Sequence, residues 1–227
     1  MGTFQKKFYK KATRTKKPFK KPKLPIRHQI ADVAYKGYST AMWIKNLINV
    51  EKKSIDNLSQ YPVDWTGVQQ VINVPTLGTA DTSRIGDSIL NKKIVYRGMV
   101  QRSIIGTPVD SILRIILIRD KANIIGNIDR LLQYHTSVFG VHSPKSDDDM
   151  YNSKILYDQK FILTQSDPIK TFDIQISDLN DHTHFEHSTT NIKTGAYKLF
   201  VLSNADPAAL NHKPSITWVS RFYYIDN

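Results

Sequence analysis

The chain has 227 residues, 40% of them hydrophobic, which fits one large domain or two small ones. It lacks cysteine, which excludes disulfides, cysteine zinc sites and thiol nucleophiles and favours a reducing compartment. No apolar stretch approaches the roughly 20 residues of a membrane-spanning helix, and basic residues interrupt the N-terminus where a signal peptide has its apolar centre. We therefore expect a soluble protein made in the cytosol, with no membrane partner.

Positive charge is concentrated in a leader, residues 1–28. The leader holds eleven of the 32 basic residues and no acidic residue, whereas the rest of the chain has 21 basic residues against 20 acidic ones. Its prolines and self-repulsion predict a disordered arm, and its interspersed aromatic residues suit stacking on unpaired bases. A solvated tail or a nuclear-import signal alone is the alternative. We predict that the arm binds nucleic acid through Lys6, Lys7, Lys10, Lys11, Arg14, Lys16, Lys17, Lys20, Lys21, Lys23 and Arg27.

Residues 29–45 follow with a loosely helical spacing of apolar side chains, which Gly37 weakens. They predict a short helix or an irregular lead-in that joins the arm to the body.

The body, residues 46–227, is predicted to be one all-β domain. Runs of Val, Ile, Thr, Tyr and Phe alternate with clusters of Gly, Pro, Asn and Asp. Eight strands with long, uneven connections favour an eight-stranded jelly-roll sandwich over a regular meander. The predicted strands are 47–56, 67–74, 89–102, 112–119, 154–163, 171–177, 196–203 and 215–224.

Two of these strands have informative patterns. Alternation places Ile94, Tyr96, Gly98 and Val100 on one face of their strand. The segment 112–118 is almost continuously apolar, which predicts a strand buried on both faces. The long connection between that strand and Lys154 is predicted to form an outer feature or a subunit contact.

Five stretches, in order along the chain, resemble coat proteins of circovirus-like viruses, which have circular single-stranded DNA genomes and encode a replication initiator. Coat proteins of the satellite tobacco necrosis viruses share the pattern. The sequence departs from its commonest form at Lys154, where many relatives have Arg followed by Phe. The matching stretches are 49–53 with Asp56, 84–98, 113–121, 154–160 and 220–226.

The resemblance implies a virion protein, a capsid subunit that assembles with itself into an icosahedral shell of about sixty copies. Its arm would face inward on a single-stranded DNA genome, with RNA as the alternative cargo, and the arm could direct nuclear import. A non-viral jelly-roll module, either a lectin or a single-stranded nucleic-acid chaperone, is the alternative function. The candidate cations for the inner surface of the shell are Arg84, Lys92, Lys93, Arg97 and Arg102, although a salt bridge or a solvated face is favoured for each of them.

Two other clusters have weaker meanings. Residues 178–187 hold His182, His184 and His187 with three acids, which permits a metal site or a pH-sensitive contact, although a polar surface loop is favoured. The run Asp147–Asp149 permits a calcium site, but a solvated loop is favoured. No metal or cofactor is therefore predicted.

Enzyme signatures are missing from the sequence. There is no nucleophile elbow, Walker loop, zinc-protease helix motif or dinucleotide-binding glycine motif, so we predict that the protein is not an enzyme. The tryptophans Trp43, Trp65 and Trp218 are predicted to be packing anchors.

Overall fold

The computed structural model describes residues 52–103, 110–134, 138–146, 151–208 and 212–226. The arm and the lead-in over 29–45 lie outside these residues, so both stay predictions. The principal strands are β1 (Lys52–Pro62), β2 (Val68–Val71), β5 (Ser88–Gln101), β6 (Ser111–Asp120), β7 (Ser153–Leu163), β8 (Ile169–Ile176), β11 (Ala196–Ser203) and β12 (Ser215–Asp226). Shorter elements are β3 (Thr76–Leu77), β4 (Ser83–Arg84), β9 (Asp181–Phe185), β10 (Ile192–Thr194) and the 3-10 turns η1 (Ile128–Arg130) and η2 (Val138–His142).

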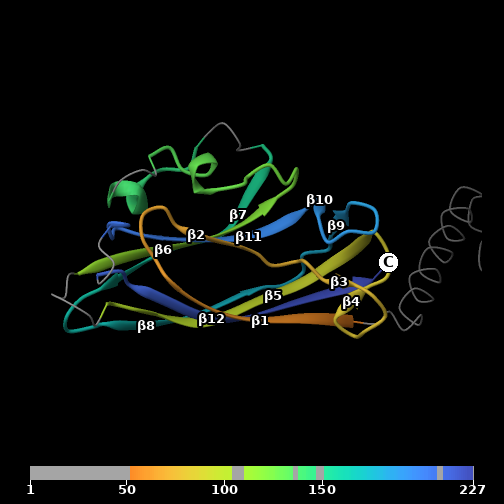
Figure 1. Cartoon of the computed structure of the whole chain (residues 1–227), viewed down its shortest axis with the longest axis horizontal. Helices are drawn as coiled ribbons and strands as arrows, with labels where there is room; N and C mark the ends of the chain where they lie inside the picture. Colours follow the sequence, from red (N-terminus) through yellow and green to blue (C-terminus); the bar gives the residue numbers. More distant parts are fainter. Residues whose placement is uncertain (1–51, 104–109, 135–137, 147–150, 209–211, 227) are drawn as a thin grey trace, which may run out of the picture. The chain divides into compact units, whose positions relative to one another are not determined.

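The principal strands form two antiparallel sheets that lie face to face (Figure 1). Sheet I has the order β1-β12-β5, with β8 beside one half of β5 and β9 beside the other half. Sheet II has the order β2-β11-β6-β7. Numbered one to eight along the chain, the principal strands pair as 1-8-3-6 and 2-7-4-5, which is jelly-roll connectivity. The predicted all-β, eight-stranded jelly roll is confirmed.

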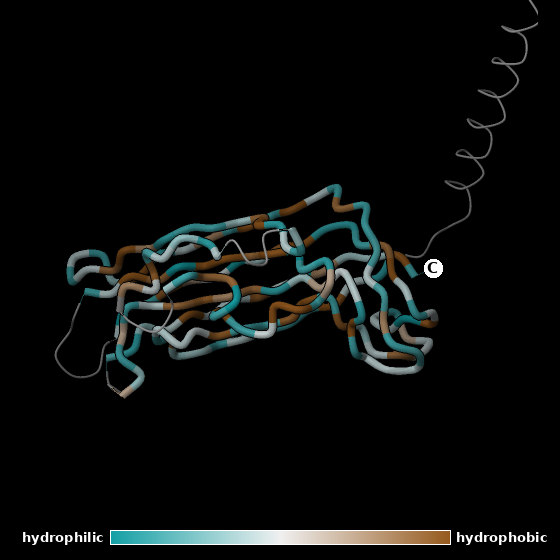
Figure 2. Tube along the Cα trace, turned by 90° about the horizontal axis from the view of Figure 1, so that it is seen from above, coloured by the Kyte–Doolittle hydropathy of each residue, from teal (hydrophilic) through white to brown (hydrophobic). Residues whose placement is uncertain are grey.

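The main core lies between the two sheets and follows from the alternation of the strands. Ile94, Tyr96 and Val100 are buried, whereas Arg97 between them is exposed. Trp218 is one of the largest fully buried side chains, and its indole N–H donates to Gln70 at 3.0 Å. Figure 2 shows the resulting mixture of apolar and polar segments along the strands. Trp218 is therefore a packing anchor as predicted, while Trp65 is only half-buried and Trp43 lies outside the described residues.

A second hydrophobic cluster covers the face of sheet II that points away from sheet I. The connection between β6 and β7, which includes η1 and η2, lies over this face (Figure 1). Residues 116 and 118 of β6 point into this cluster, while 113, 115 and 117 point into the main core. The prediction that this strand is buried on both faces is confirmed. The cluster consists of Ile116, Ile118, Ile125, Ile128, Leu131, Leu132, Val141, Phe200 and Leu202.

Two buried cations fix the connection to sheet II. The Lys198 ammonium donates to Asp120 at 2.9 Å and to the carbonyl of Ile125 at 2.7 Å. The Arg114 guanidinium forms a bidentate pair with Asp158 and donates to the carbonyl of Ser143 at 2.6 Å. Both cations are thus neutralised and hydrogen-bonded, as burial of a charge requires.

Two predictions about individual segments were wrong. β1 continues to Pro62 instead of ending at residue 56, because its backbone pairs with β12 along the whole stretch, whatever the polarity of its side chains. The segment around the histidines was predicted as a loop. It begins with the expected turn, since Asp178 and Asn180 have positive φ, but residues Asp181–Phe185 then form strand β9 against β5.

Candidate nucleic-acid interface

The eleven predicted arm residues lie outside the described part of the chain. Their role therefore rests on their charge pattern alone. What the structure offers is the surface of the jelly-roll body.

The outer face of sheet I, meaning the side chains that point away from the core, gathers several of the body's basic groups. Lys93, Val95 and Arg97 alternate along β5 on this face. The register places Val95 between Arg221 of β12 and Gln175 of β8. Arg97 lies in the same way between Val219 and Asp173. Three strands thus contribute neighbouring side chains to one patch.

A hollow of about 330 Å³ opens at the centre of this patch. It forms because the short Val95 side chain is surrounded by longer ones on the same strand and on both neighbouring strands. Three of the lining side chains are cationic, one is aromatic and none is acidic. The lining residues are Lys93, Val95, Arg97, Gln175, Val219, Arg221 and Tyr223.

Acidic residues next to the hollow hold its arginines. Asp56 on β1 accepts from Nε and Nη2 of Arg221 at 2.6 and 2.5 Å. These hydrogen bonds lower the pKa of Asp56 and raise the pKa of Arg221. Arg221 also interacts with Tyr223. Asp173 on β8 accepts from Nε of Arg97 at 3.1 Å. The two guanidinium groups are therefore oriented before any ligand arrives.

Five cations were predicted to line the inside of the shell. Two of them, Lys93 and Arg97, lie on the face of sheet I that points away from the core. Arg84 is not a surface cation, because it is fully buried, lies 3.9 Å over the ring of Phe185 and donates to the carbonyls of Gly86 and Thr189. It pairs with Asp87 at 3.6 Å, as the favoured salt-bridge interpretation predicted. Arg102 is also buried and pairs with Asp110 at 3.8 Å.

Lys92 is the fifth of these cations. It donates to Asn180 at 2.8 Å, next to the β-bulge where the β5–β12 register shifts. The sequence could not show which of these five cations are buried and which are exposed, because the residues that contact them come from other parts of the chain.

The histidine segment does not form a metal cluster. His182 and His184 stack on β9 with ring centroids 5.9 Å apart, and His187 pairs with Asp87 at 2.8 Å. This pair lowers the pKa of Asp87, first through the hydrogen bond from His187. Within the described ranges, no three His, Asp or Glu side chains are placed to hold a metal ion. Asp147–Asp149 lie outside those ranges.

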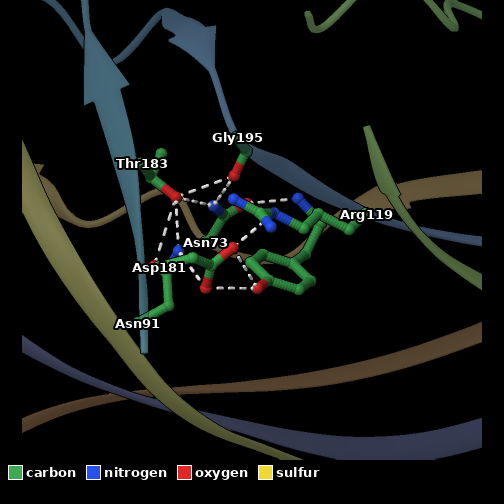
Figure 3. Close-up of polar contacts among 7 residues, drawn as sticks. Asn73, Asn91, Arg119, Asp181, Thr183 and Gly195 are labelled. Atoms are coloured by element: carbon green, nitrogen blue, oxygen red, sulfur yellow. Dashed lines mark hydrogen bonds and ion pairs between the residues drawn. The ribbon is translucent and has the colours of Figure 1, made fainter. Parts of the chain in front are cut away.

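A buried polar network was not predicted from the sequence. Figure 3 shows Asp181 next to Arg119, with which it forms an ion pair, and Thr183 next to Asn73, Asn91 and Gly195. Asp181 also accepts from the Tyr197 hydroxyl at 2.6 Å.

Burial and this hydrogen bond raise the pKa of Tyr197 well above its usual range. The residues come from both sheets and pair mostly with one another, although Nε of Arg119 contacts Asp181 as an ion pair without a well-directed hydrogen bond. We therefore assign the network a structural role, that of joining the two sheets at one end of the sandwich.

No helix in the described ranges is long and apolar enough to span a membrane. No family model matches the chain, and no curated protein matches it. A solved structure of Desmodium yellow mottle tymovirus aligns at 10% identity and a TM-score of 0.38, covering 77% of this chain and 88% of that one.

A structure of the KBV activated particle at acidic pH aligns at 12% identity and a TM-score of 0.36, covering 76% and 68%. Neither likeness is close enough to support an inference about this chain. The resemblance to circovirus-like coat proteins stays a prediction.

Proposed function

We propose that the chain is a capsid subunit that assembles with itself into a closed shell and packages single-stranded nucleic acid through the eleven cations of its arm. The observation that supports this most is the combination of a jelly-roll body with a leader that has eleven basic residues and no acidic one. A body with balanced charge does not need such a leader in order to fold. A container for a polyanion needs positive charge of this kind in order to neutralise its contents.

Assembly would cover surfaces that the single molecule leaves open. β1 lies at one edge of sheet I and β7 at one edge of sheet II, and each exposes a large apolar side chain, Leu58 and Ile162 respectively. Open edges with exposed apolar residues favour association between chains. A closed symmetric shell would bury such features without unlimited growth, because its contacts return on themselves.

The electrostatics of the arm fit packaging without sequence preference. Eleven contacts to a single strand predict a slope of log K against log salt of roughly −8, at about −0.7 per contact. Binding of this kind is tight at low salt and indifferent to sequence. About sixty arms would bring on the order of 660 positive charges to the genome.

The finer assignments belong to the same proposal. The resemblance favours a DNA genome, a shell of about sixty copies and a place in the virion. The basic leader also suits transport of newly made subunits from the host cytoplasm into the nucleus.

The arm can be tested with two full-length variants. In one, the eleven Lys and Arg of the arm become Gln; in the other, the same residues 4–27 are shuffled in order. Because non-specific phosphate binding depends on charge, the shuffled protein should keep its affinity for single-stranded DNA and its steep salt dependence, while the Gln protein should lose both. Full nucleic-acid load in the Gln protein would contradict the packaging role. A single 26.0 kDa species under all conditions would favour the alternative binding module.

A further inference from the structure

The hollow on the outer face of sheet I has the features of a ligand site. Its lining includes the apolar side chains of Val95 and Val219 and the aromatic side chain of Tyr223. Lys93, Arg97 and Arg221 surround it with positive charge. Pockets for small ligands combine these same elements, an apolar lining with a few oriented polar groups.

We propose that this hollow binds one unpaired nucleotide of a single-stranded nucleic acid, with its phosphate on the three cations and its base against Val95, Val219 and Tyr223. The inference rests on the proposed function for its ligand, the packaged strand, but it concerns a different part of the protein. It gives the folded body a contact of its own with the genome.

Charge complementarity selects this occupant. Three cations line the hollow, and Asp56 and Asp173 beside it neutralise two of them, so one net positive charge remains to attract an anion and to repel the chain's own polycationic arm. A free phosphate would contact the cations but leave the two valines and the tyrosine without a partner. A nucleotide uses both, since every base has a flat face that stacks on an aromatic side chain.

The arginines keep donors for a phosphate despite their ion pairs. A guanidinium has five N–H donors, and the pair with Asp56 uses Nε and Nη2 of Arg221. Three N–H bonds of Arg221 therefore lie outside that pair, and the interaction with Tyr223 does not use all of them. At Arg97, which is 66% exposed, the contact with Asp173 involves Nε. The acids thus fix the direction of each guanidinium without occupying it fully.

The size of the hollow also suits one nucleotide. Its volume of about 330 Å³ lies at the lower end of the range for small-molecule sites. A peptide strand or a second folded chain would have to engage the whole sheet face instead. One such contact is weak, but repetition over the subunits of a shell would make the total binding strong.

Photochemical cross-linking of the full chain tests the site directly. The probe is a single-stranded oligonucleotide with 5-iodouracil in place of thymine, which cross-links to aromatic side chains it stacks on. Trypsin cuts after Arg221 and releases residues 222–227, in which Phe222 and Tyr224 are fully buried and Tyr223 is partly exposed. We expect a cross-link at Tyr223, lost when the hollow is filled by Val95→Met.

The same digest separates this inference from the proposed function. Cross-links at Phe4, Phe8, Tyr9 or Phe19 report the arm, and a cross-link at Tyr223 reports the hollow. Arm cross-links without one at Tyr223 would overturn the nucleotide site and leave packaging by the arm intact. A cross-link at Tyr223 that persists in Val95→Met would also overturn it, because the contact would then not depend on the hollow.

Charge substitution gives an independent measurement. The double variant Lys93→Gln and Arg97→Gln should reduce the steepness of the salt dependence of full-chain binding by about 1.4, two contacts at about 0.7 each. The matched control is Lys154→Gln with Lys160→Gln, two exposed lysines on β7 of the other sheet. An equal change in both double variants would contradict a site at the hollow.

Discussion

Gly98 lies on β5 between Trp218 of β12 and Phe172 of β8. A Cβ atom at this position would be 2.2 Å from the carbonyl oxygen of Thr217 and 2.8 Å from the ring of Phe172. The backbone of β12 cannot move away without breaking its pairing with β5. We therefore expect Gly98→Ala to lower the free energy of unfolding by about 3 kcal/mol, measured by urea denaturation. Gly126→Ala is the control, since a Cβ there meets no atom within 4 Å, and an equal loss in both would contradict the explanation.

The buried pair of Lys198 and Asp120 gives a second prediction at this scale. Their side chains are 4% and 0% exposed. Asp120→Ala would leave a buried ammonium without its counter-charge, so we expect a loss of about 3–5 kcal/mol in the free energy of unfolding. The double variant Asp120→Ala with Lys198→Met should recover part of this loss, because it removes the uncompensated charge.

An exposed pair provides the comparison for this substitution. Lys170 and Asp167 are paired at the surface, with side chains 39% and 51% exposed. Asp167→Ala should change the free energy of unfolding by less than about 1 kcal/mol. If Asp167→Ala lowered the free energy of unfolding as much as Asp120→Ala, burial would not explain the effect of Asp120→Ala.

At the residue scale, alternation predicted which side chains of β5 share a face, but not which cations of the body lie at the surface. Arg84 and Arg97 look alike in the sequence, yet one lies over Phe185 in the interior and the other lies beside the hollow. The difference comes from residues far away in the chain. Arg221 and Tyr223 were missed for the same reason, because a pocket made by three strands requires the strand order.

The connection between β6 and β7 is the element whose packing is most easily tested. Leu131 lies in the second hydrophobic cluster and is 1% exposed. Leu131→Ala should cost about 2–5 kcal/mol in local stability. Hydrogen exchange should quicken at amides of the connection such as Lys121 and Ser146, while the β5–β12 amides stay protected.

The control for this experiment is Leu58→Ala. Leu58 is 75% exposed on edge strand β1. Its truncation should therefore leave the amides of the connection and those of β5 and β12 protected from exchange. Faster exchange throughout both sheets in Leu131→Ala would show that the connection is not a separate layer on sheet II.

At the element scale, the strands with strong patterns were the predictable ones. The apolar run over 112–118 indicated burial on both faces, and the connection supplies the second cover. Strand β9 was missed because its His and Thr residues are typical of a polar loop, and only pairing with β5 makes them a strand. The second half of β1 was missed because edge pairing with β12 tolerates polar side chains.

For the whole molecule, the jelly-roll connectivity could be predicted from the number and spacing of strands, but the sheet order could not. That order places the first and last of the described strands, β1 and β12, side by side in sheet I, with β1 at the edge. The proposed function depends on contacts between copies of the chain, which the structure of one chain does not include.

Electron microscopy of the purified full chain, combined with its nucleic-acid content, tests the central claim most directly. We predict uniform closed particles of about sixty subunits that contain single-stranded nucleic acid. A population of separate 26.0 kDa molecules or small oligomers, free of nucleic acid at low salt, would contradict the account.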